Sequence, residues 1–151
     1  MSLSDDRPTV LALSGPNLNL LGEREPEVYG TATLAEIIEG VEEVASTRGL
    51  HLEHHQTNSE AEMVAIIQEA RGRVEAIIIN PGAFTHYAYA IHDALAMFEG
   101  VIVELHLSNP AAREHWRRTS VVASAATASI TGFGAYGYVL AIDAVSRMLA
   151  G

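Results

Sequence analysis

The chain has 151 residues, of which 48% are hydrophobic and 19% charged, and it contains no cysteine. These totals predict one globular domain, residues 1–151, with residues 1–8 as a flexible N-terminal extension, and they exclude disulfides and thiolate chemistry. The formal net charge of −10 argues against a nucleic-acid partner and an anionic membrane partner. The acidic start of the chain is not a signal peptide, so we expect a cytoplasmic location.

Apolar periodicity and turn residues predict five strands that alternate with helices. The strands are expected at residues 10–13, 51–55, 76–79, 101–105 and 126–131. The helices are expected from a Thr33 cap to Gly49, from an Asn58 or Ser59 cap to Gly72, over residues 87–98, from a Ser108 or Asn109 cap through Arg113, Arg117 and Arg118, and over residues 134–149.

The run Ala76-Ile77-Ile78-Ile79 shows no polar alternation, which is typical of a strand that is covered on both faces. Together with the repeated strand–helix order, it predicts an α/β fold of the flavodoxin-like kind. That fold is a doubly wound, five-stranded parallel sheet with helices on both faces. The uncharged run over residues 119–142 is interrupted by Ser, Thr and Gly, so we expect no membrane span.

A long segment, residues 14–30, follows the first predicted strand. Its prolines and glycines disfavour a helix, so we expect a loop, and long loops in compact domains often carry function. It contains Asn17, Arg24 and Tyr29. Other polar residues follow the third and fourth strands, and ligands in such folds bind beyond the carboxyl ends of the strands. The residues expected to converge there are Asn17, Arg24, Tyr29, Asn80, His86, His106 and Ser108.

These residue types suit acid–base chemistry. Arg24 lies five residues before Tyr29 and would stabilise a phenolate that removes a proton from carbon. Glu104 and His106 are two apart on a strand, so they share a face, and the carboxylate would prepare the imidazole as a general acid. Ser108 and the amides of the following helix would bind a carboxylate. Arg113 and Arg117, four apart, would share a helix face as ligand contacts or as a solvated or interface surface.

Two further patterns are weaker. Residues 132–137 match GxGxxG, but the chain ends before the strand and acidic residue that a dinucleotide site needs. We therefore interpret these glycines as close helix packing. His51, Glu53 and His55 alternate on one strand face and could bind a metal, but an exposed strand face is the simpler interpretation.

Several motifs stand in order along nearly the whole chain, from about Thr9 to Leu149. They are Gly15-Pro16-Asn17-Leu18-Asn19-Leu20-Leu21-Gly22, Arg24-Glu25-Pro26, Tyr29-Gly30, Asn80-Pro81-Gly82-Ala83, Thr85-His86, Asp93-Ala94, Glu104-Leu105-His106-Leu107-Ser108-Asn109 and Gly137-Tyr138. With these motifs the sequence resembles the type II 3-dehydroquinate dehydratases. The resemblance implies a hydro-lyase that converts 3-dehydroquinate to 3-dehydroshikimate by anti elimination through an enolate, in aromatic biosynthesis or quinate breakdown.

The resemblance also implies a role for each matching residue. Tyr29 would be the base, Arg24 its cation, His106 the acid, and Asn17 would hold a water against the enolate oxygen. The substrate carboxylate would meet Asn80, Leu107 and Ser108, while His86 and Arg117 would contact ring hydroxyls. Residues 20–29 would form a lid. No cofactor and no metal are implied.

The same resemblance implies a homododecamer, a tetramer of trimers, in which Asp93 reaches the site of a neighbouring subunit. The chain departs from the family pattern at His92, where arginine is usual, and at Ser124 and Ala128 near the last strand. These changes touch the expected trimer contact and a local turn. The alternative from another class is a non-catalytic flavodoxin-like module that binds a flavin or a small acid.

Overall fold

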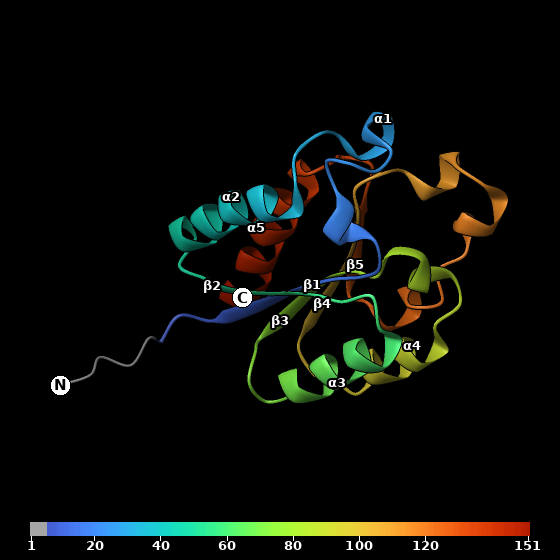
Figure 1. Cartoon of the computed structure of the whole chain (residues 1–151). Coiled ribbons are helices and arrows are strands. Elements are labelled where there is room, and N and C mark those ends of the chain that lie inside the picture. The colour runs from blue at the N-terminus through green and yellow to red at the C-terminus, as the bar shows by residue number, and fades with distance from the viewer. Residues whose placement is uncertain (1–5) are drawn as a thin grey trace.

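The computed structural model describes residues 6–151 and shows a five-stranded parallel sheet between two layers of helices (Figure 1). The strand order is β2-β1-β3-β4-β5, which is the flavodoxin-like order that the sequence predicts. The strands are β1 (Thr9–Ser14), β2 (His51–Gln56), β3 (Ala76–Asn80), β4 (Val101–His106) and β5 (Ala128–Thr131). The longer helices are α2 (Leu34–Thr47), α3 (Glu60–Ala70), α4 (Tyr89–Ala96) and α5 (Tyr136–Ala150).

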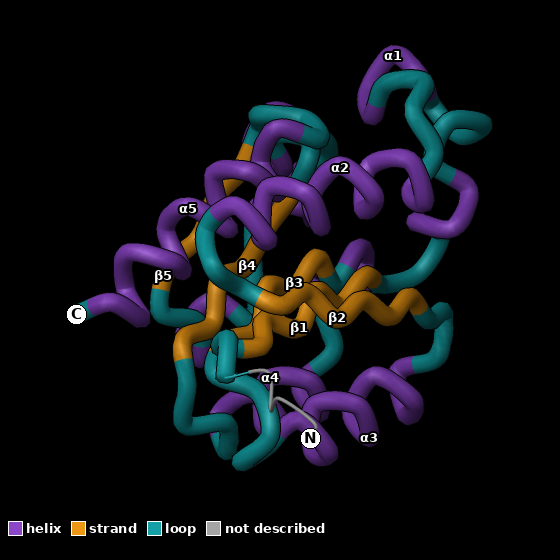
Figure 2. The backbone as a smooth tube through the Cα atoms, turned by 90° about the vertical axis from the view of Figure 1, so that its left-hand side faces the viewer, coloured by secondary structure: helices purple, strands orange, loops and turns teal. Residues whose placement is uncertain are grey.

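The core consists of two apolar clusters, one on each face of the sheet. Figure 2 shows α2 and α5 over one face and α3 and α4 over the other. Side chains alternate between the clusters along each central strand: Val10 and Ala12 face the α2–α5 layer, whereas Leu11 and Leu13 face the α3–α4 layer. All five residues of β3 are buried, so its unalternated aliphatic run is a two-sided strand as predicted.

Local signals set the ends of the helices. The Thr33 hydroxyl accepts a hydrogen bond from the Glu36 amide and caps α2, and Ser59 caps α3 in the same way through the Glu62 amide. A Cβ at Gly137 would lie 2.8 Å from Cδ1 of Leu105. The last glycine of the GxGxxG match therefore lets α5 approach β4 closely, which is the packing role that we expected.

Two expectations about irregular segments were wrong. The loop after β1 contains a turn of 3-10 helix, Leu18–Leu20, and a one-turn helix α1, Pro26–Tyr29, with proline in its first turn. The predicted helix through the arginines is instead two short 3-10 turns, Pro110–Ala112 and His115–Arg118, with extended backbone at Arg113 between them. No residue of these two turns is buried, so no apolar face is available to stabilise a continuous helix.

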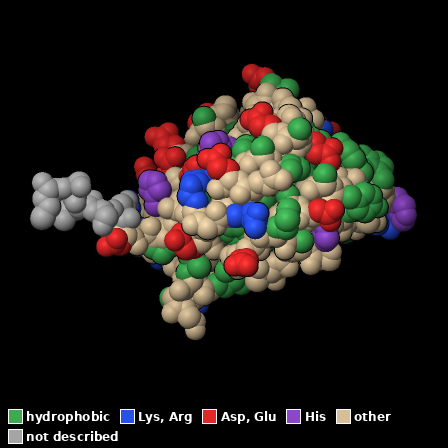
Figure 3. Space-filling view, turned by 90° about the horizontal axis from the view of Figure 1, so that it is seen from below, with side chains coloured by type: hydrophobic (Ala, Val, Ile, Leu, Met, Phe, Trp, Pro, Cys, Tyr) green, Lys and Arg blue, Asp and Glu red, His purple; other side chains and the backbone are tan. Residues whose placement is uncertain are grey.

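The rest of the surface is consistent with the acidic composition. Seen from the side of α3 and α4, basic side chains lie scattered among acidic and apolar ones, without a continuous basic surface (Figure 3). Within residues 6–151, no helix is long and apolar enough to cross a membrane. The backbone carbonyl of Pro8 accepts a hydrogen bond from the amide of His51, the first residue of the edge strand β2. Pro8 is therefore bonded to the sheet. The rest of the expected extension, residues 1–5, lies outside the described residues.

Candidate active site

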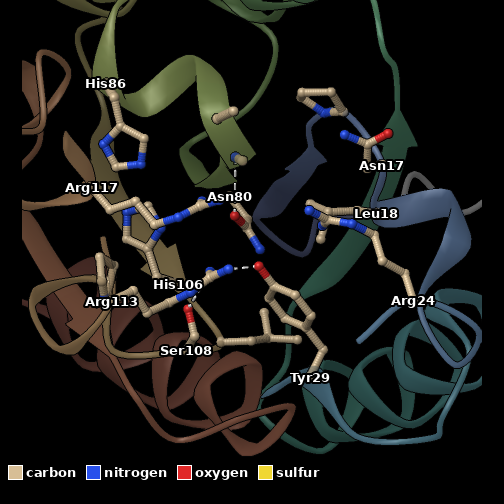
Figure 4. Close-up of a pocket in the computed structure, with 15 residues that line it drawn as sticks. Asn17, Leu18, Arg24, Tyr29, Asn80, His86, His106, Ser108, Arg113 and Arg117 are labelled. Atoms are coloured by element: carbon tan, nitrogen blue, oxygen red, sulfur yellow. Dashed lines mark hydrogen bonds between the residues drawn. The ribbon is translucent and has the colours of Figure 1, made fainter. Parts of the chain in front are cut away.

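A pocket lies beyond the carboxyl ends of β1, β3 and β4, where the sequence predicts a site (Figure 4). Of the residues that the sequence analysis selected, nine line it: Asn17, Arg24, Tyr29, Asn80, His86, His106, Leu107, Ser108 and Arg117. The pocket also contains Arg113, which sequence reasoning left undecided. Asp93 is not part of this pocket, and its side chain is 81% exposed on α4.

Glycine allows the loops after β1 and β3 to meet at the pocket floor. The Gly15 amide donates to the Asn80 carbonyl at 2.8 Å, and a Cβ on Gly15 would lie only 2.4 Å from the Pro81 carbonyl oxygen. Because any side chain would collide with backbone there, the close approach requires glycine. Two residues further on, Asn17 has a positive φ of 70°, and its backbone amide donates to Oδ1 of Asn58.

The imidazole of His106 is held from behind by a buried carboxylate. Its Nε2 lies 2.6 Å from Oε2 of Glu104, whose side chain is only 4% exposed. The Ser120 hydroxyl lies 3.0 Å from both Glu104 oxygens and donates to this carboxylate. Buried polar groups need such partners, and the contact with Glu104 fixes the orientation of the ring. The bond occupies Nε2, which leaves Nδ1 as the nitrogen available to a ligand.

The phenol of Tyr29 is held by a residue far away in the sequence. Nη1 of Arg113 donates to the Tyr29 hydroxyl at 2.7 Å and lies 3.3 Å from Oγ of Ser108. The guanidinium carbon of Arg24 lies 5.6 Å from the ring centroid, and that of Arg113 lies 5.4 Å from it. Arg113, not Arg24, therefore makes the direct contact with the phenol oxygen. The sequence offered no local signal for this contact, because the partners are 84 residues apart.

Glu25 lies between these two cations. Its Oε2 is 3.6 Å from Arg24 and 3.7 Å from Arg113, and its φ of 42° is in the left-handed region that non-glycine residues rarely adopt. Tyr29 is thus held by one hydrogen bond from Arg113, and its loop is held by the long ionic contact between Glu25 and Arg113. This half of the pocket depends on side chains that meet across the opening.

The opposite rim carries His86 and Arg117. Nδ1 of His86 bonds the Thr119 carbonyl at 2.7 Å, so this nitrogen carries the proton and Nε2 is an acceptor. Burial lowers the pKa of His86, which favours the neutral ring at neutral pH. The Arg117 guanidinium lies 4.1 Å from the ring centroid of Trp116, and its Nε bonds Glu114 at 3.0 Å. Both residues present polar groups that suit a hydroxylated ligand.

Two of the backbone amides after β4 that we expected to bind an anion already have partners. The Asn109 side chain accepts the Ala111 amide, and its carbonyl accepts the Ala112 amide, so these two amides are not free for a ligand. Three-residue 3-10 turns also lack the macrodipole of a long helix. Positive charge comes instead from Arg24, Arg113 and Arg117, which line the pocket, whereas the carboxylates that contact them, Glu25 and Glu114, are not among the lining residues. An anion is therefore favoured here despite the acidic chain.

A metal site is not visible in the described part of the chain. No group of three or more His, Asp or Glu side chains converges within residues 6–151. In the β2 pattern, Glu53 bonds Arg73 at 2.7 Å and His55 at 3.1 Å. The bond to Arg73 lowers the pKa of Glu53. This is the exposed strand face that we favoured over a metal site.

Comparison with known proteins identifies close relatives. The family model described as Dehydroquinase class II matches residues 8–146. The catabolic 3-dehydroquinase of Verticillium alfalfae is 50% identical over 138 residues, which cover 91% of this chain and 92% of that protein. The 3-dehydroquinate dehydratase 2 of Pseudomonas putida is 46% identical over 143 residues, or 95% of this chain and 96% of that protein.

Solved structures agree with these relatives. The type II dehydroquinase from Propionibacterium acnes superposes with a TM-score of 0.90 and is 41% identical. The aligned part covers 92% of this chain and 96% of that one. The type II dehydroquinase from Butyrivibrio crossotus also superposes with a TM-score of 0.90, at 38% identity. Fold and sequence thus point to one family.

Proposed function

This chain belongs to the class II dehydroquinase family, and from that premise we propose that it dehydrates 3-dehydroquinate to 3-dehydroshikimate and water. One observation supports this proposal most. A phenol paired with a guanidinium and an imidazole paired with a buried carboxylate lie in the same cationic pocket. An elimination needs one group to remove a proton from carbon and another to protonate the departing hydroxyl.

The base is Tyr29 in its phenolate form. It takes the proton beside the ketone, and the electrons of that C–H bond form an enolate. The Arg113 guanidinium, 2.7 Å from the phenol oxygen, stabilises the phenolate by a charge-assisted hydrogen bond, and Arg24 adds a second positive charge nearby. Asn17 at the pocket edge would hold a water against the enolate oxygen, a role in which such donors stabilise developing charge.

The acid is His106 in its imidazolium form. As the enolate collapses, the C–O bond of the leaving hydroxyl breaks and His106 supplies the proton that makes it water. Glu104 stabilises this imidazolium and keeps its orientation. The two steps take one proton from carbon and give one to oxygen, so the reaction needs only the chain's own side chains. We expect an anti elimination, which is the stereochemistry that the family resemblance implies.

The remaining residues would position the substrate. Asn80, the Leu107 amide and Ser108 would bind its carboxylate, and His86 with Arg117 would contact the ring hydroxyls. Oδ1 of Asn80 accepts the Gly82 amide at 3.2 Å, so its amide nitrogen is the group left for an anion. The pocket holds about 60 Å³, well below typical small-ligand sites. Residues 20–29 would therefore act as a lid that opens for the substrate.

We also propose that the chain assembles as a dodecamer of four trimers in the cytoplasm and that Asp93 serves a neighbouring site. In support, the Asp93 carboxylate is exposed and lies outside its own pocket, while Oδ1 of Asp93 lies 3.1 Å from His92. The other ring nitrogen of His92 lies 3.1 Å from the Ser124 hydroxyl. Two of the residues that depart from the family pattern thus bond each other. Light scattering on the purified protein tests the oligomer.

The activity test follows the ultraviolet absorbance of the conjugated enone product after purified protein is mixed with 3-dehydroquinate. Tyr29→Phe removes only the hydroxyl, so we expect kcat to fall by about 10³-fold or more while substrate binding is largely kept. Full activity of this variant would remove Tyr29 from its role. A wild-type protein that is inert toward 3-dehydroquinate and copurifies with flavin would contradict the proposed function altogether.

A further inference from the structure

The loop after β1 is held at its start by the strands on both sides. β1 lies between β2 and β3 in the sheet, and its pairing with β2 ends where Ser14 lies opposite Gln56. At the next residue, Gly15, the amide donates to the carbonyl of Asn80 at the end of β3. The Gly15 carbonyl accepts a hydrogen bond from Nε2 of Gln56 at 3.0 Å. The Gln56 side chain thus extends the contact between the two strands by one residue into the loop.

A second side chain beyond β2 holds the loop at Asn17. The backbone amide of Asn17 donates to Oδ1 of Asn58 at 3.0 Å, and the same oxygen accepts Nε2 of Gln56 at 3.1 Å. The Gln56–Asn58 pair is therefore bonded internally and holds both the Gly15 carbonyl and the Asn17 amide. Gln56 is half-buried, whereas Asn58 is exposed. Because water competes less for a half-buried hydrogen bond, Gln56 makes the stronger of the two contacts with the loop.

Asn17 has a backbone conformation that needs such support. Its φ of 70° and ψ of −5° lie in the left-handed region, which non-glycine residues rarely adopt and which persists where the surroundings enforce it. Asn17 precedes the 3-10 turn Leu18–Leu20, but its side chain makes no capping hydrogen bond to that turn. The side chain instead lines the pocket (Figure 4). The backbone at Asn17 thus sets where its side-chain amide lies, and the Gln56–Asn58 pair holds that backbone.

We propose that the Gln56–Asn58 pair positions Asn17 so that its side chain can hold a water against the enolate oxygen. This inference rests on the proposed function, in which Asn17 has that role. Neither Gln56 nor Asn58 lines the pocket, so both are positioning residues that act through the loop. A group that stabilises developing charge works because it is fixed in place before the reaction. A displacement of about 1 Å can lower a rate by about 10²-fold, so the support behind Asn17 matters for the chemistry.

The first test removes the support without touching the pocket. Gln56→Met keeps the length of the side chain and removes its N–H donors. We expect kcat for 3-dehydroquinate to fall about tenfold with KM little changed, because the enolate charge develops only after binding. Asn58→Ala removes an exposed bond and should lower kcat about threefold, whereas Asn58→Asp keeps the oxygen acceptor and should keep the wild-type kcat. Gln68→Met makes the matched change at an exposed position of α3 outside the pocket and should also match wild type.

A double-mutant cycle with Asn17→Ala separates positioning from a structural role. If Gln56 acts through Asn17, Gln56→Met should cause no further loss of kcat once the Asn17 side chain is gone. Equal losses in both backgrounds would overturn the inference, because Gln56 would then act on the fold or on another group. Wild-type kcat in Gln56→Met would overturn it as well. If Gln56→Met does not fold, Asn58→Ala at its exposed position supplies the same cycle.

The same measurements distinguish this inference from the proposed function. Full activity of Asn17→Ala would remove the role that the Gln56–Asn58 pair is proposed to support, and the inference would fail while the enzyme still worked. A wild-type protein that forms no enone product from 3-dehydroquinate would contradict the proposed function itself.

Discussion

The two halves of the pocket are built in different ways. On the strand side, Asn80, Glu104 and His106 are 5%, 3% and 8% exposed and sit at the ends of β3 and β4. On the loop side, Asn17 is exposed, Tyr29 is half-buried, and helix α1 has no buried residue. The fold itself therefore fixes His106, the proposed acid, whereas Tyr29, the proposed base, is held only by contacts across the opening. Such lids are commonly drawn from regions of low local stability.

The largest loss of kcat is expected on the strand side, when the carboxylate that holds His106 is removed. Glu104→Gln takes away the carboxylate charge beside the imidazole and replaces one hydrogen-bond acceptor by a group that can also donate. We expect kcat for 3-dehydroquinate to fall by about 10³-fold, with KM little changed because Glu104 lies behind the imidazole. Steady-state kinetics together with a melting curve measure this.

The chain contains a matched control for that variant. Glu53 and His55 repeat the same i, i+2 pairing on the edge strand β2, at 3.1 Å and away from the pocket. Glu53→Gln should leave kcat at the wild-type value. If Glu104→Gln kept full kcat, the buried pair would be a structural contact and the acid would have to be found elsewhere.

On the loop side, the prediction concerns which arginine stabilises the Tyr29 phenolate. Arg113→Gln removes the donor 2.7 Å from the Tyr29 hydroxyl, so we expect kcat to fall by about 10²-fold. Arg24→Gln removes a charge that acts only across space, and about a tenfold loss is expected. Kinetics of the two variants side by side give the order. An Arg24 variant more damaged than the Arg113 variant would contradict the assignment and restore the pairing that the sequence suggested.

The contrast between the two halves also shows which contacts of the site could be predicted from the sequence. The strand side was predictable, because parallel strands bring their ends together and an i, i+2 pair must share a face. Glu104 and His106 therefore meet as expected. The contact between Tyr29 and Arg113 was not predictable in this way, since it joins segments 84 residues apart through irregular backbone. Arg24 was the nearer cation in the sequence, but nearness along a loop does not determine which side chains touch.

The segment after β4 shows a second limit. Pro110 at a helix start and arginines four apart favoured one continuous helix, and Asn109 does cap a turn there. Helical stability in proteins comes mainly from packing an apolar face, however, and this segment buries none. The extended backbone at Arg113 is what lets the guanidinium reach the phenol. Local signals described the start of the turn correctly and missed the break at Arg113.

The loops after β1 and β3 meet at Gly15, and a substitution there should disrupt their contact. Gly15→Ala would place a Cβ 2.4 Å from the Pro81 carbonyl oxygen, and backbone on both sides leaves little room to relax. We expect a loss of about 3 kcal/mol in the free energy of unfolding, together with lower activity as Asn17 moves away from Asn80. Urea denaturation measures the first effect, and the enone assay measures the second.

Gly40 provides the control for that substitution. It lies on the exposed face of α2, and a Cβ there meets no atom within 4 Å. Gly40→Ala should therefore raise the free energy of unfolding by about 0.5–1 kcal/mol and leave activity unchanged. If Gly15→Ala behaved like Gly40→Ala, the two loops could not be held together by close backbone contact.

A pH-dependent effect is expected beneath the start of the loop, where β1 ends. Ser14 is fully buried, and its hydroxyl lies 3.0 Å from Nε2 of His54 and 3.2 Å from the Tyr138 hydroxyl. Burial, with a smaller contribution from the charge of His55, lowers the pKa of His54 from 6.5 to about 4. Between these two values the unfolded chain binds a proton that the folded chain does not. Stability from this group is thus complete above about pH 6.5 and is lost as the pH falls toward 4.

The full shift of His54 would correspond to about 3 kcal/mol, but the ring is partly open to solvent, so we expect about 1–2 kcal/mol. Carboxylates titrate in the same range, and only the difference between two proteins isolates the histidine. His54→Gln can still bond Ser14 but does not titrate. The free energy of unfolding of wild type, measured in urea from pH 7 to pH 4, should therefore decline more steeply than that of the variant. Parallel curves would mean that His54 titrates alike in both states, and the buried bond to Ser14 would then contribute no pH dependence at the base of the loop.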